Sequence, residues 1–171
     1  IIPNSSKTKK EIESFNKELD EDLPFIVENG AAIYNLNLIN ASFPEKISLS
    51  REISEILDIF NNKISKKYKS KCKFIKNLIS DKQLQIFGQS KEKVKLAMNR
   101  EYSIPLLYDG SKTEKVDLIK SVNNAGLSLH EGGRVINLCD KISKSQAMKH
   151  VVKIFKKISK EELITIGVGD N

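Results

Sequence analysis

The first thirty residues set the order of the elements, and they read IIPNSSKTKK EIESFNKELD EDLPFIVENG from position 1 to position 30. The apolar pair at 1–2 predicts the end of a strand, and apolar side chains at helical spacing predict an amphipathic helix over 7–19. Residues 25–27, Phe-Ile-Val, predict a short buried strand before a turn at 28–30. Strand, helix and strand in this order are typical of an α/β protein with a parallel sheet.

The same order returns at the other end of the chain, with a different middle. We expect a helix over 145–157 and a buried strand over 163–168. Periodicity and turn signals between the two ends predict helices at 51–68, 81–87, 91–98 and 112–125, strands at 72–75 and 102–108, and a hairpin around Glu131-Gly132-Gly133. The sequence therefore predicts an α/β, Rossmann-like core from residues 1–40 and 136–171, with an α+β domain inserted at 41–135.

Composition narrows the class of protein. The 171 residues contain 29 Lys and Arg against 22 Asp and Glu, and 39% of them are hydrophobic, so a disordered chain is excluded. The longest apolar runs are far shorter than the ~20 residues of a membrane span. Two cysteines, Cys72 and Cys139, are too few for a disulfide framework. We therefore expect a cytoplasmic protein that does not bind membranes; composition does not set its oligomeric state.

Hydroxyl, amide and ammonium groups meet at the first of three stretches that could bind an anion or a metal. Asn4, Ser5, Ser6 and Lys7 lie where a predicted strand ends and a helix begins. The free N–H groups and the dipole of a helix N-terminus favour phosphate at such a place. Helix capping by Ser5 or Ser6 explains the same residues without a ligand.

The other two stretches lie near the end of the chain. Lys144 is predicted in the first turn of a helix, where an anion would offset the unfavourable position of a lysine at the positive end of the dipole. A solvated surface lysine is the alternative. Asp170, in Gly169-Asp170-Asn171, suits Mg²⁺, and an Asp–Asn turn is the alternative. The acidic run at 20–22 is predicted to be a solvated loop at the opposite edge of the sheet.

Taken in order, these stretches resemble the haloacid dehalogenase superfamily. The resemblance rests on residues 1–8, on residues 24–31 (PFIVENGA), on the lysine that begins a helix and on Gly169-Asp170-Asn171. The inserted domain has the position of the cap in the Cof-type, class IIB branch. Within that branch, residues 96–103 (LAMNREYS) are similar to the mannosyl-3-phosphoglycerate phosphatase family.

The resemblance implies a Mg²⁺-dependent phosphatase that works through an aspartyl-phosphate. Within the narrower family it implies hydrolysis of mannosyl-3-phosphoglycerate to the compatible solute mannosylglycerate. By motif, Ser5 and Lys144 would hold the transferring phosphoryl group, and Asp170 would bind Mg²⁺. The substrate-binding positions that the resemblance implies are Asn4, Ser6, Lys7, Asn29, Gly30, Arg100, Ser103 and Arg134.

Two departures from the family pattern lead to further expectations. The Asp-x-Asp motif that supplies the nucleophile is absent and would precede Ile1, so we expect residues 1–171 to be a piece of a longer protein, inactive by itself. The lysine motif normally reads Asp-Lys-Gly, whereas here it reads Ser143-Lys144-Ser145, and Asp140-Lys141 offers a second register. We prefer Lys144, because Ala147 and the apolar stripe of the helix then match the family's spacing.

Two alternative functions are open at this stage. The first is the same chemistry on glucosyl-3-phosphoglycerate or another sugar phosphate. The second is a basic nucleic-acid-binding module, for which the chain offers a run of lysines at 63, 66, 67, 69, 71, 73 and 76. Only 6% of residues are aromatic and no RNA-binding signature is present, so a solvated, lysine-rich helix end is the preferred interpretation and no nucleic-acid partner is expected.

Overall fold

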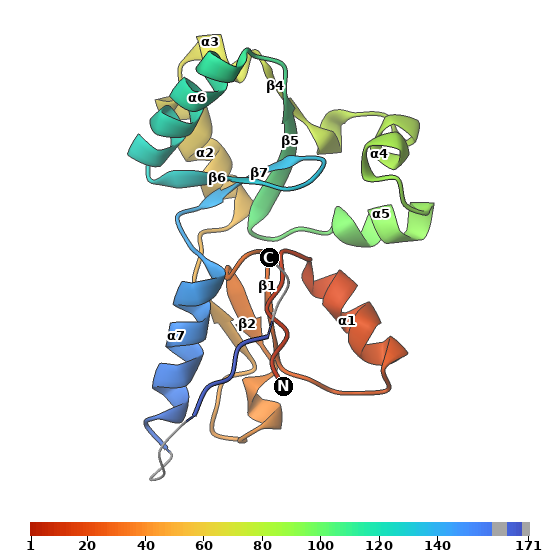
Figure 1. The fold of residues 1–171 in the computed structure, drawn as a ribbon, viewed down its shortest axis with the longest axis vertical. Coiled ribbons are helices and arrows are strands. Elements are labelled where there is room, and N and C mark those ends of the chain that lie inside the picture. Colours follow the sequence, from red (N-terminus) through yellow and green to blue (C-terminus); the bar gives the residue numbers. More distant parts are fainter. Residues whose placement is uncertain (159–163, 169–171) are drawn as a thin grey trace.

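The chain forms two α/β units stacked along the long axis of the molecule (Figure 1). This computed structural model describes residues 1–158 and 164–168. One unit is built on a three-stranded sheet and contains the N-terminus, and the other is built on a four-stranded sheet. We call them the core unit and the cap unit. The expected α/β class is confirmed, but the strands of the core unit pair antiparallel, and among the described residues the expected parallel pairing is represented by the bridge between Asn4 and Ile26.

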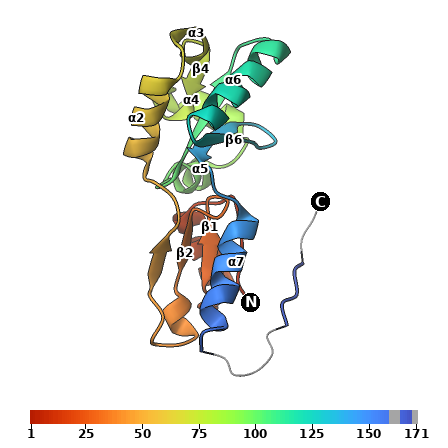
Figure 2. The same ribbon diagram turned by 90° about the vertical axis from the view of Figure 1, so that its left-hand side faces the viewer.

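The core unit is a sheet covered by one helix on each face. Its strands are β1 (Phe25–Val27), β2 (Ala32–Tyr34) and β3 (Lys46–Ser48), antiparallel in the order β1-β2-β3. Helix α1 (Lys9–Glu18) and helix α7 (Lys144–Phe155) lie on opposite sides of this sheet (Figures 1 and 2). The opening segment of the chain runs parallel to β1, to which it is joined by a bridge between Asn4 and Ile26.

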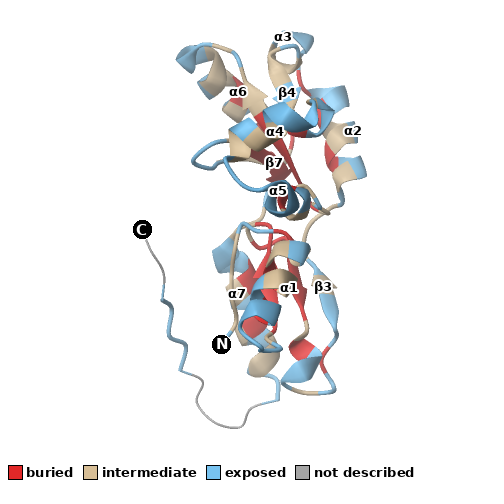
Figure 3. Ribbon diagram, turned by 90° about the vertical axis from the view of Figure 1, so that its right-hand side faces the viewer, coloured by how far each residue is buried: buried red, intermediate tan, exposed pale blue. Residues whose placement is uncertain are grey.

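Alternation along β1 distributes its side chains between the two helices. Phe25 and Val27 pack in a buried cluster with Ile12 of α1, whereas Ile26 packs with Ala147 of α7. All three β1 side chains are buried, because a strand between two helices presents an apolar side chain to each layer in turn. Figure 3 shows the interior of the sheets as buried, and β3 and the outer faces of the helices as largely exposed.

The cap unit is an antiparallel sheet with two helices packed on it. Its strands, in the order β4-β5-β7-β6, are β4 (Cys72–Phe74), β5 (Ser103–Tyr108), β7 (Ile136–Asp140) and β6 (Leu127–Glu131). Helices α2 (Ile53–Lys63) and α6 (Lys112–Asn124) bury their apolar stripes against it. The shorter elements are α3 (Lys66–Lys69), α4 (Ser80–Phe87), α5 (Lys91–Ala97) and the 3₁₀ turns η1 (Leu36–Leu38) and η2 (Ile75–Asn77).

Strand pairing moves both expected domain boundaries. The expected insert began at residue 41, but β3 pairs with β2, so the chain leaves the core sheet only after Ser48. The expected core resumed at residue 136, but β7 pairs with β5 and β6 and belongs to the cap sheet. The cap unit therefore extends from about residue 50 to Asp140, because each strand goes where its backbone hydrogen-bond partners are.

An ion pair joins the two connections between the units. Arg51, in the first connection, donates from Nε and Nη2 to the Asp140 carboxylate, at 3.0 and 2.6 Å. The same carboxylate accepts the Arg51 backbone N–H at 3.0 Å. These hydrogen bonds from Arg51 lower the pKa of Asp140 to about 2. The pair therefore fixes the spacing of the two chain segments that carry the cap.

The end of the chain differs from the expected buried strand. Leu163 lies outside the described residues, and residues 164–168 form no strand. Ile164, Ile166 and Val168 are exposed, at 81, 83 and 97%. The physical reason is that a strand needs a neighbour to pair its backbone groups, and residues 164–168 pair with no strand of the described chain. Within the same residues, no helix is long and apolar enough to cross a bilayer.

Candidate functional site

Three segments meet where the opening stretch of the chain ends. The backbone N–H of Ser5 donates to the carbonyl of Ile26 at 3.0 Å, and the N–H of Asn29 donates to the carbonyl of Ser5 at 3.0 Å. These two bonds hold Ser5 beside the carboxyl end of β1. The amide Nδ2 of Asn4 donates to the carbonyl of Lys144 at 3.1 Å, which brings the first turn of α7 to the same place.

The N-cap residue of helix α1 is Thr8; neither Ser5 nor Ser6 caps this helix. Thr8 accepts the backbone N–H of Glu11 at 3.2 Å, and Glu11 accepts the N–H of Thr8 at 2.8 Å, which is a capping box. The Ser5 hydroxyl accepts only the N–H of Lys7, at 3.2 Å, among the described residues. The alternative explanation of Ser5 and Ser6 as helix caps is therefore wrong, and their hydroxyls are available to other partners.

Gly30 allows α7 to approach this loop closely. Its φ is +102°, and a Cβ atom there would lie 2.4 Å from the carbonyl oxygen of Ser143 and 3.0 Å from the nitrogen of Lys144. Both are backbone atoms, so any side chain at this position would push the loop and the helix apart. Glu28 and Asn29, before Gly30, also have positive φ, at 46° and 64°. The loop turns sharply enough to pack against the helix N-terminus.

Lys144 is the first residue of α7, and Ser143 caps the helix by accepting the N–H of Gln146 at 3.2 Å. Within the described residues, the N–H groups of Lys144 and Ser145 carry no hydrogen bond, and the buried Oδ1 atom of Asn4 has no partner. Lys141, the competing lysine, lies three residues earlier in the connection from β7. The start of α7 thus brings free helix N–H groups to the loop that carries Ser5, and Lys144 is part of that first turn, a set of groups that suits a phosphate.

A cavity of about 450 Å³ lies between the core unit and the cap unit beside these residues. Three cationic side chains, Lys7, Arg100 and Arg134, line it. Lys7 comes from the core and forms an ion pair with Glu11 at 3.1 Å, while the two arginines come from the cap. Glu11 also lines the cavity, as its one carboxylate, and the remaining lining residues are Ser6, Phe87, Gly88, Gln89, Ala97, Gly132, Gly133, Val135 and Asn137. A negatively charged ligand is the complementary occupant.

Arg100 is held by several hydrogen bonds at the edge of this cavity. Its Nε atom donates to the carbonyl of Ala97 at 3.1 Å, and its Nη1 atom donates to Ser103 Oγ at 2.9 Å and to the carbonyl of Ser6 at 3.4 Å. Ser103 itself is fully buried and donates its hydroxyl hydrogen to Glu28 at 2.5 Å. Ser103 was expected to bind substrate. The structure instead places it behind Arg100, and it does not line the cavity.

Glu28 is a buried carboxylate that links the core to the cap. Its oxygens accept the N–H groups of Glu101 and Tyr102 at 2.9 and 3.2 Å, in addition to the Ser103 hydroxyl. Burial raises the pKa of Glu28 above its ordinary value, although these hydrogen bonds and the nearby Arg100 guanidinium act in the opposite direction. The amino group Nη1 of Arg100 lies 3.9 Å from Glu28 Oε2.

Arg134 reaches the cavity from the hairpin between β6 and β7. Gly88, at the end of α4, has φ +57° and lies against the guanidinium, so that a Cβ atom at Gly88 would be 2.7 Å from Arg134 Nη1. Because Arg134 is the flexible end of a long side chain, it would move rather than clash. Gly88 therefore shapes the surface on which Arg134 rests.

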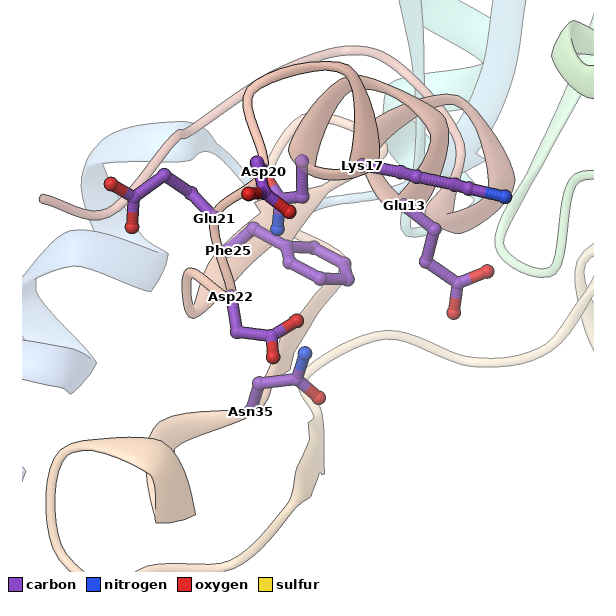
Figure 4. A pocket seen from close by; sticks show the side chains of 8 residues that line it. Glu13, Lys17, Asp20, Glu21, Asp22, Phe25 and Asn35 are labelled. Carbon is purple, nitrogen blue, oxygen red and sulfur yellow. The ribbon is translucent and has the colours of Figure 1, made fainter.

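The acidic run at 20–22 lies at the other end of the core sheet. A pocket of about 420 Å³ is lined there by Asp20, Glu21 and Asp22 together with Phe25, the first residue of β1, whereas Glu28 and Asn29 follow its last residue. Figure 4 shows the Glu21 and Glu13 carboxylates directed to opposite sides of this pocket. No three Asp, Glu, His or Cys side chains of the described residues gather closely enough to hold a metal ion.

The expected metal ligand, Asp170, lies outside the described residues. The other expected positions are brought together in two groups. Asn4, Ser5, Asn29, Gly30 and Lys144 meet at the start of α7, and Ser6, Lys7, Arg100 and Arg134 line the adjoining cavity. Residue types alone gave no role to Glu28 or Gly88, because the residues that they contact are distant in sequence.

The lysine run of the cap is partly neutralised. Lys71 pairs with Glu114 at 2.5 Å, Lys73 pairs with Asp109, and Lys69 donates to the carbonyl of Asn61. Two of the seven lysines are therefore neutralised by a carboxylate, and Lys69 keeps its charge but is held against the backbone. These contacts weaken the case for a nucleic-acid interface, which depends on unpaired positive charge.

The sequence is related along its whole length to known phosphatases. It is 32% identical to a glucosyl-3-phosphoglycerate/mannosyl-3-phosphoglycerate phosphatase from Persephonella marina, over 100% of this chain and 65% of that protein. It is 28% identical to a mannosyl-3-phosphoglycerate phosphatase from Pyrococcus furiosus, over 100% of this chain and 71% of that protein. The chain thus spans about two thirds of these relatives. No protein-family model matches it.

Solved structures share the fold at lower sequence identity. A haloacid dehalogenase-like hydrolase from B. subtilis superposes with a TM-score of 0.57 at 14% identity, covering 91% of this chain and 66% of that one. A sugar phosphatase of haloacid dehalogenase subclass IIB gives a TM-score of 0.51 at 12% identity, covering 91% and 62%. At this identity the likeness shows the fold.

Proposed function

We propose that this chain, which is homologous to glucosyl- and mannosyl-3-phosphoglycerate phosphatases and has the fold of haloacid dehalogenase-like hydrolases, forms most of the active site of such a phosphatase. The substrate we propose is mannosyl-3-phosphoglycerate, hydrolysed to mannosylglycerate and phosphate. Glucosyl-3-phosphoglycerate is the second candidate, and the name of the Persephonella relative includes both compounds. We assign the reaction to the cytoplasm, as a step in making a compatible solute.

The observation that carries this proposal is the convergence of Ser5, Gly30 and Lys144. Ser5 is held at the end of β1, and Gly30 lets the first turn of α7 pack against the loop that follows β1. A phosphoryl group between them would accept hydrogen bonds from the Ser5 hydroxyl, the Lys144 ammonium and the free N–H groups of α7. Donors fixed before the reaction stabilise charge that develops in the transition state without reorganising.

The rest of the substrate would occupy the cavity between the units. A sugar phosphoglycerate carries a carboxylate, which an arginine guanidinium binds in a planar, two-pronged geometry. Arg134 can supply that geometry from the cap, and Arg100 supplies one amino group, Nη2, while Lys7 lines the cavity from the core in an ion pair with Glu11. These contacts hold a part of the substrate that does not react, so they contribute to binding more than to the chemical step.

The phospho-enzyme mechanism needs groups beyond those described above. We propose that an aspartate preceding Ile1 in the full-length protein attacks the phosphorus and forms the aspartyl-phosphate. Mg²⁺ would be bound by that carboxylate together with Asp170 and would neutralise phosphoryl oxygens when bound. The 171-residue chain is accordingly proposed to bind phosphate esters without hydrolysing them.

Phosphate release tests this function directly. The full-length product of the gene is assayed with Mg²⁺ on mannosyl- and glucosyl-3-phosphoglycerate, beside the 171-residue chain. We expect release by the full-length protein, and a loss of at least 100-fold, about the value of one oxyanion donor, for Lys144→Met. Lys149→Met, on an exposed position of the same helix, is the matched control, and Lys141→Met tests the competing register. No release from either compound would refute the proposal.

A further inference from the structure

Glu28 stands out among the charged side chains of the core because the cap surrounds its carboxylate. The side chain is 2% exposed, and its three hydrogen-bond donors belong to Glu101, Tyr102 and Ser103, at the start of β5. Burying a carboxylate is costly unless donors or a positive charge compensate it. Three donors and one guanidinium converge on Glu28, so a single short segment of the cap partly offsets the cost of burial.

That segment carries Arg100, one of the cationic side chains of the cavity. The Ser103 hydroxyl links Glu28 to Arg100, because it donates to the Glu28 carboxylate and accepts from Arg100 Nη1 at 2.9 Å. The Arg100 side chain is 10% exposed, and its Nε and Nη1 atoms are hydrogen-bonded within the protein. Within the described chain, its Nη2 atom carries no hydrogen bond. One face of the guanidinium is fixed while one amino group remains for a ligand.

We propose that Glu28 is a positioning residue for substrate binding: acting through Ser103, it fixes the Arg100 guanidinium so that Nη2 binds the carboxylate of the ligand. The assignment rests on the function proposed above. Glu28 does not line the cavity, so its effect on a ligand passes through Arg100. An arginine ordered before binding loses less side-chain freedom when the ligand arrives, and this raises affinity.

The steady-state kinetics of Glu28→Gln in the full-length protein separate this role from a structural one. Glutamine keeps the size of the side chain but removes its charge and places an amide group opposite the donors of residues 101–103. We expect KM for mannosyl-3-phosphoglycerate to rise about tenfold with kcat changed less than about threefold, because binding of a remote group is lost equally from the ground state and the transition state. Glu101→Gln, which removes a partly exposed carboxylate one residue from Arg100, is the matched control and is expected to change KM less than about twofold.

A double-mutant cycle provides the readout that a purely structural role would not move. If Glu28 acts through Arg100, Glu28→Gln changes KM less than about twofold in an Arg100→Ala background. If the rise in KM of the double variant equals the product of the rises caused by Glu28→Gln and Arg100→Ala separately, the proposal is overturned. Ser103→Ala keeps the test open should Glu28→Gln fold poorly: KM is expected to rise about threefold, and an unchanged KM would overturn the relay.

Binding of 3-phosphoglycerate to the 171-residue chain, measured by calorimetry, distinguishes failure of this proposal from failure of the proposed function. Absence of phosphate release by the full-length protein refutes the function alone. About tenfold weaker binding of 3-phosphoglycerate by Glu28→Gln would then still support the positioning role. Equal binding by the original chain and the variant, or no binding by either, would overturn it.

Discussion

Replacing Gly30 with alanine should disturb both the stability of the core unit and the anion site. The added Cβ would lie 2.4 Å from the carbonyl oxygen of Ser143 and 2.6 Å from its carbonyl carbon, and neither atom can rotate away. A φ of +102° costs a residue with a side chain about 1–3 kcal/mol. Displacing the first turn of α7 costs about 1–3 kcal/mol more, a typical penalty for overpacking. The free energy of unfolding should therefore fall by about 2–6 kcal/mol.

Thermal unfolding followed by circular dichroism measures this effect. For a domain of this size each kcal/mol corresponds to about 2–4 °C, so the midpoint should fall by about 4–24 °C. Gly133→Ala is the matched control, because a Cβ there meets no atom within 4 Å, and its midpoint should shift by less than about 2 °C. If the two variants unfold at the same temperature, Gly30 does not support α7 and the geometry assigned to the site is incorrect.

Three further predictions concern the connections, the thiols and the cavity. Asp140→Asn should lower the free energy of unfolding by about 2 kcal/mol at pH 7, the value of a charge-assisted hydrogen bond. Because the folded pKa of Asp140 lies at about 2, below its unfolded value, the difference from the original chain, measured by urea unfolding, should persist down to about pH 4 and vanish as the pH falls through about 2. A difference that does not depend on pH would contradict the ion pair with Arg51. Burial raises the pKa of Cys139 to about 12 and that of Cys72 to about 11. A thiol reagent at pH 8 should therefore modify neither cysteine in the folded chain and both cysteines after unfolding in urea. Rapid reaction of Cys139 in the folded chain would show that β7 is not buried. Gly88→Ala should displace Arg134 and weaken the binding of 3-phosphoglycerate measured by calorimetry, while the free energy of unfolding changes by only about 1 kcal/mol; unchanged binding would remove Arg134 from the site.

Local patterns predicted most of the elements but not every assignment of a strand to a sheet. The apolar run at 25–27 and the periodic stripes of the helices depend on neighbouring residues, and they form as expected. The boundary at residue 136 was wrong, although the hairpin signal at Gly132-Gly133 already tied residues 136–138 to 127–129. Lys46–Ser48 carries little apolar surface, and its place in the core sheet is set by pairing with β2, which no local pattern reveals.

The residues of the candidate site also fall into two groups, those that a local sequence pattern could identify and those that depend on distant partners. Ser5, Gly30 and Lys144 could be singled out because a helix N-terminus and a glycine turn have local signatures. Thr8 and Glu11 also carried a readable signal, the Thr-x-x-Glu capping box, and reading it would have freed Ser5 and Ser6 from a capping role at once. Glu28 had no such signal, because its partners lie more than 70 residues away and only the folded chain joins them.

The position of a bound oxyanion tests the central claim most directly. Crystals of the chain soaked in tungstate, a phosphate analogue with strong anomalous scattering, would locate the site without any need for turnover. The account predicts anomalous density between the Ser5 hydroxyl and the first turn of α7, within reach of Lys144, and its loss in Lys144→Met crystals. Density confined to the lysine-rich segment from α3 to β4, with none at the start of α7, would contradict it.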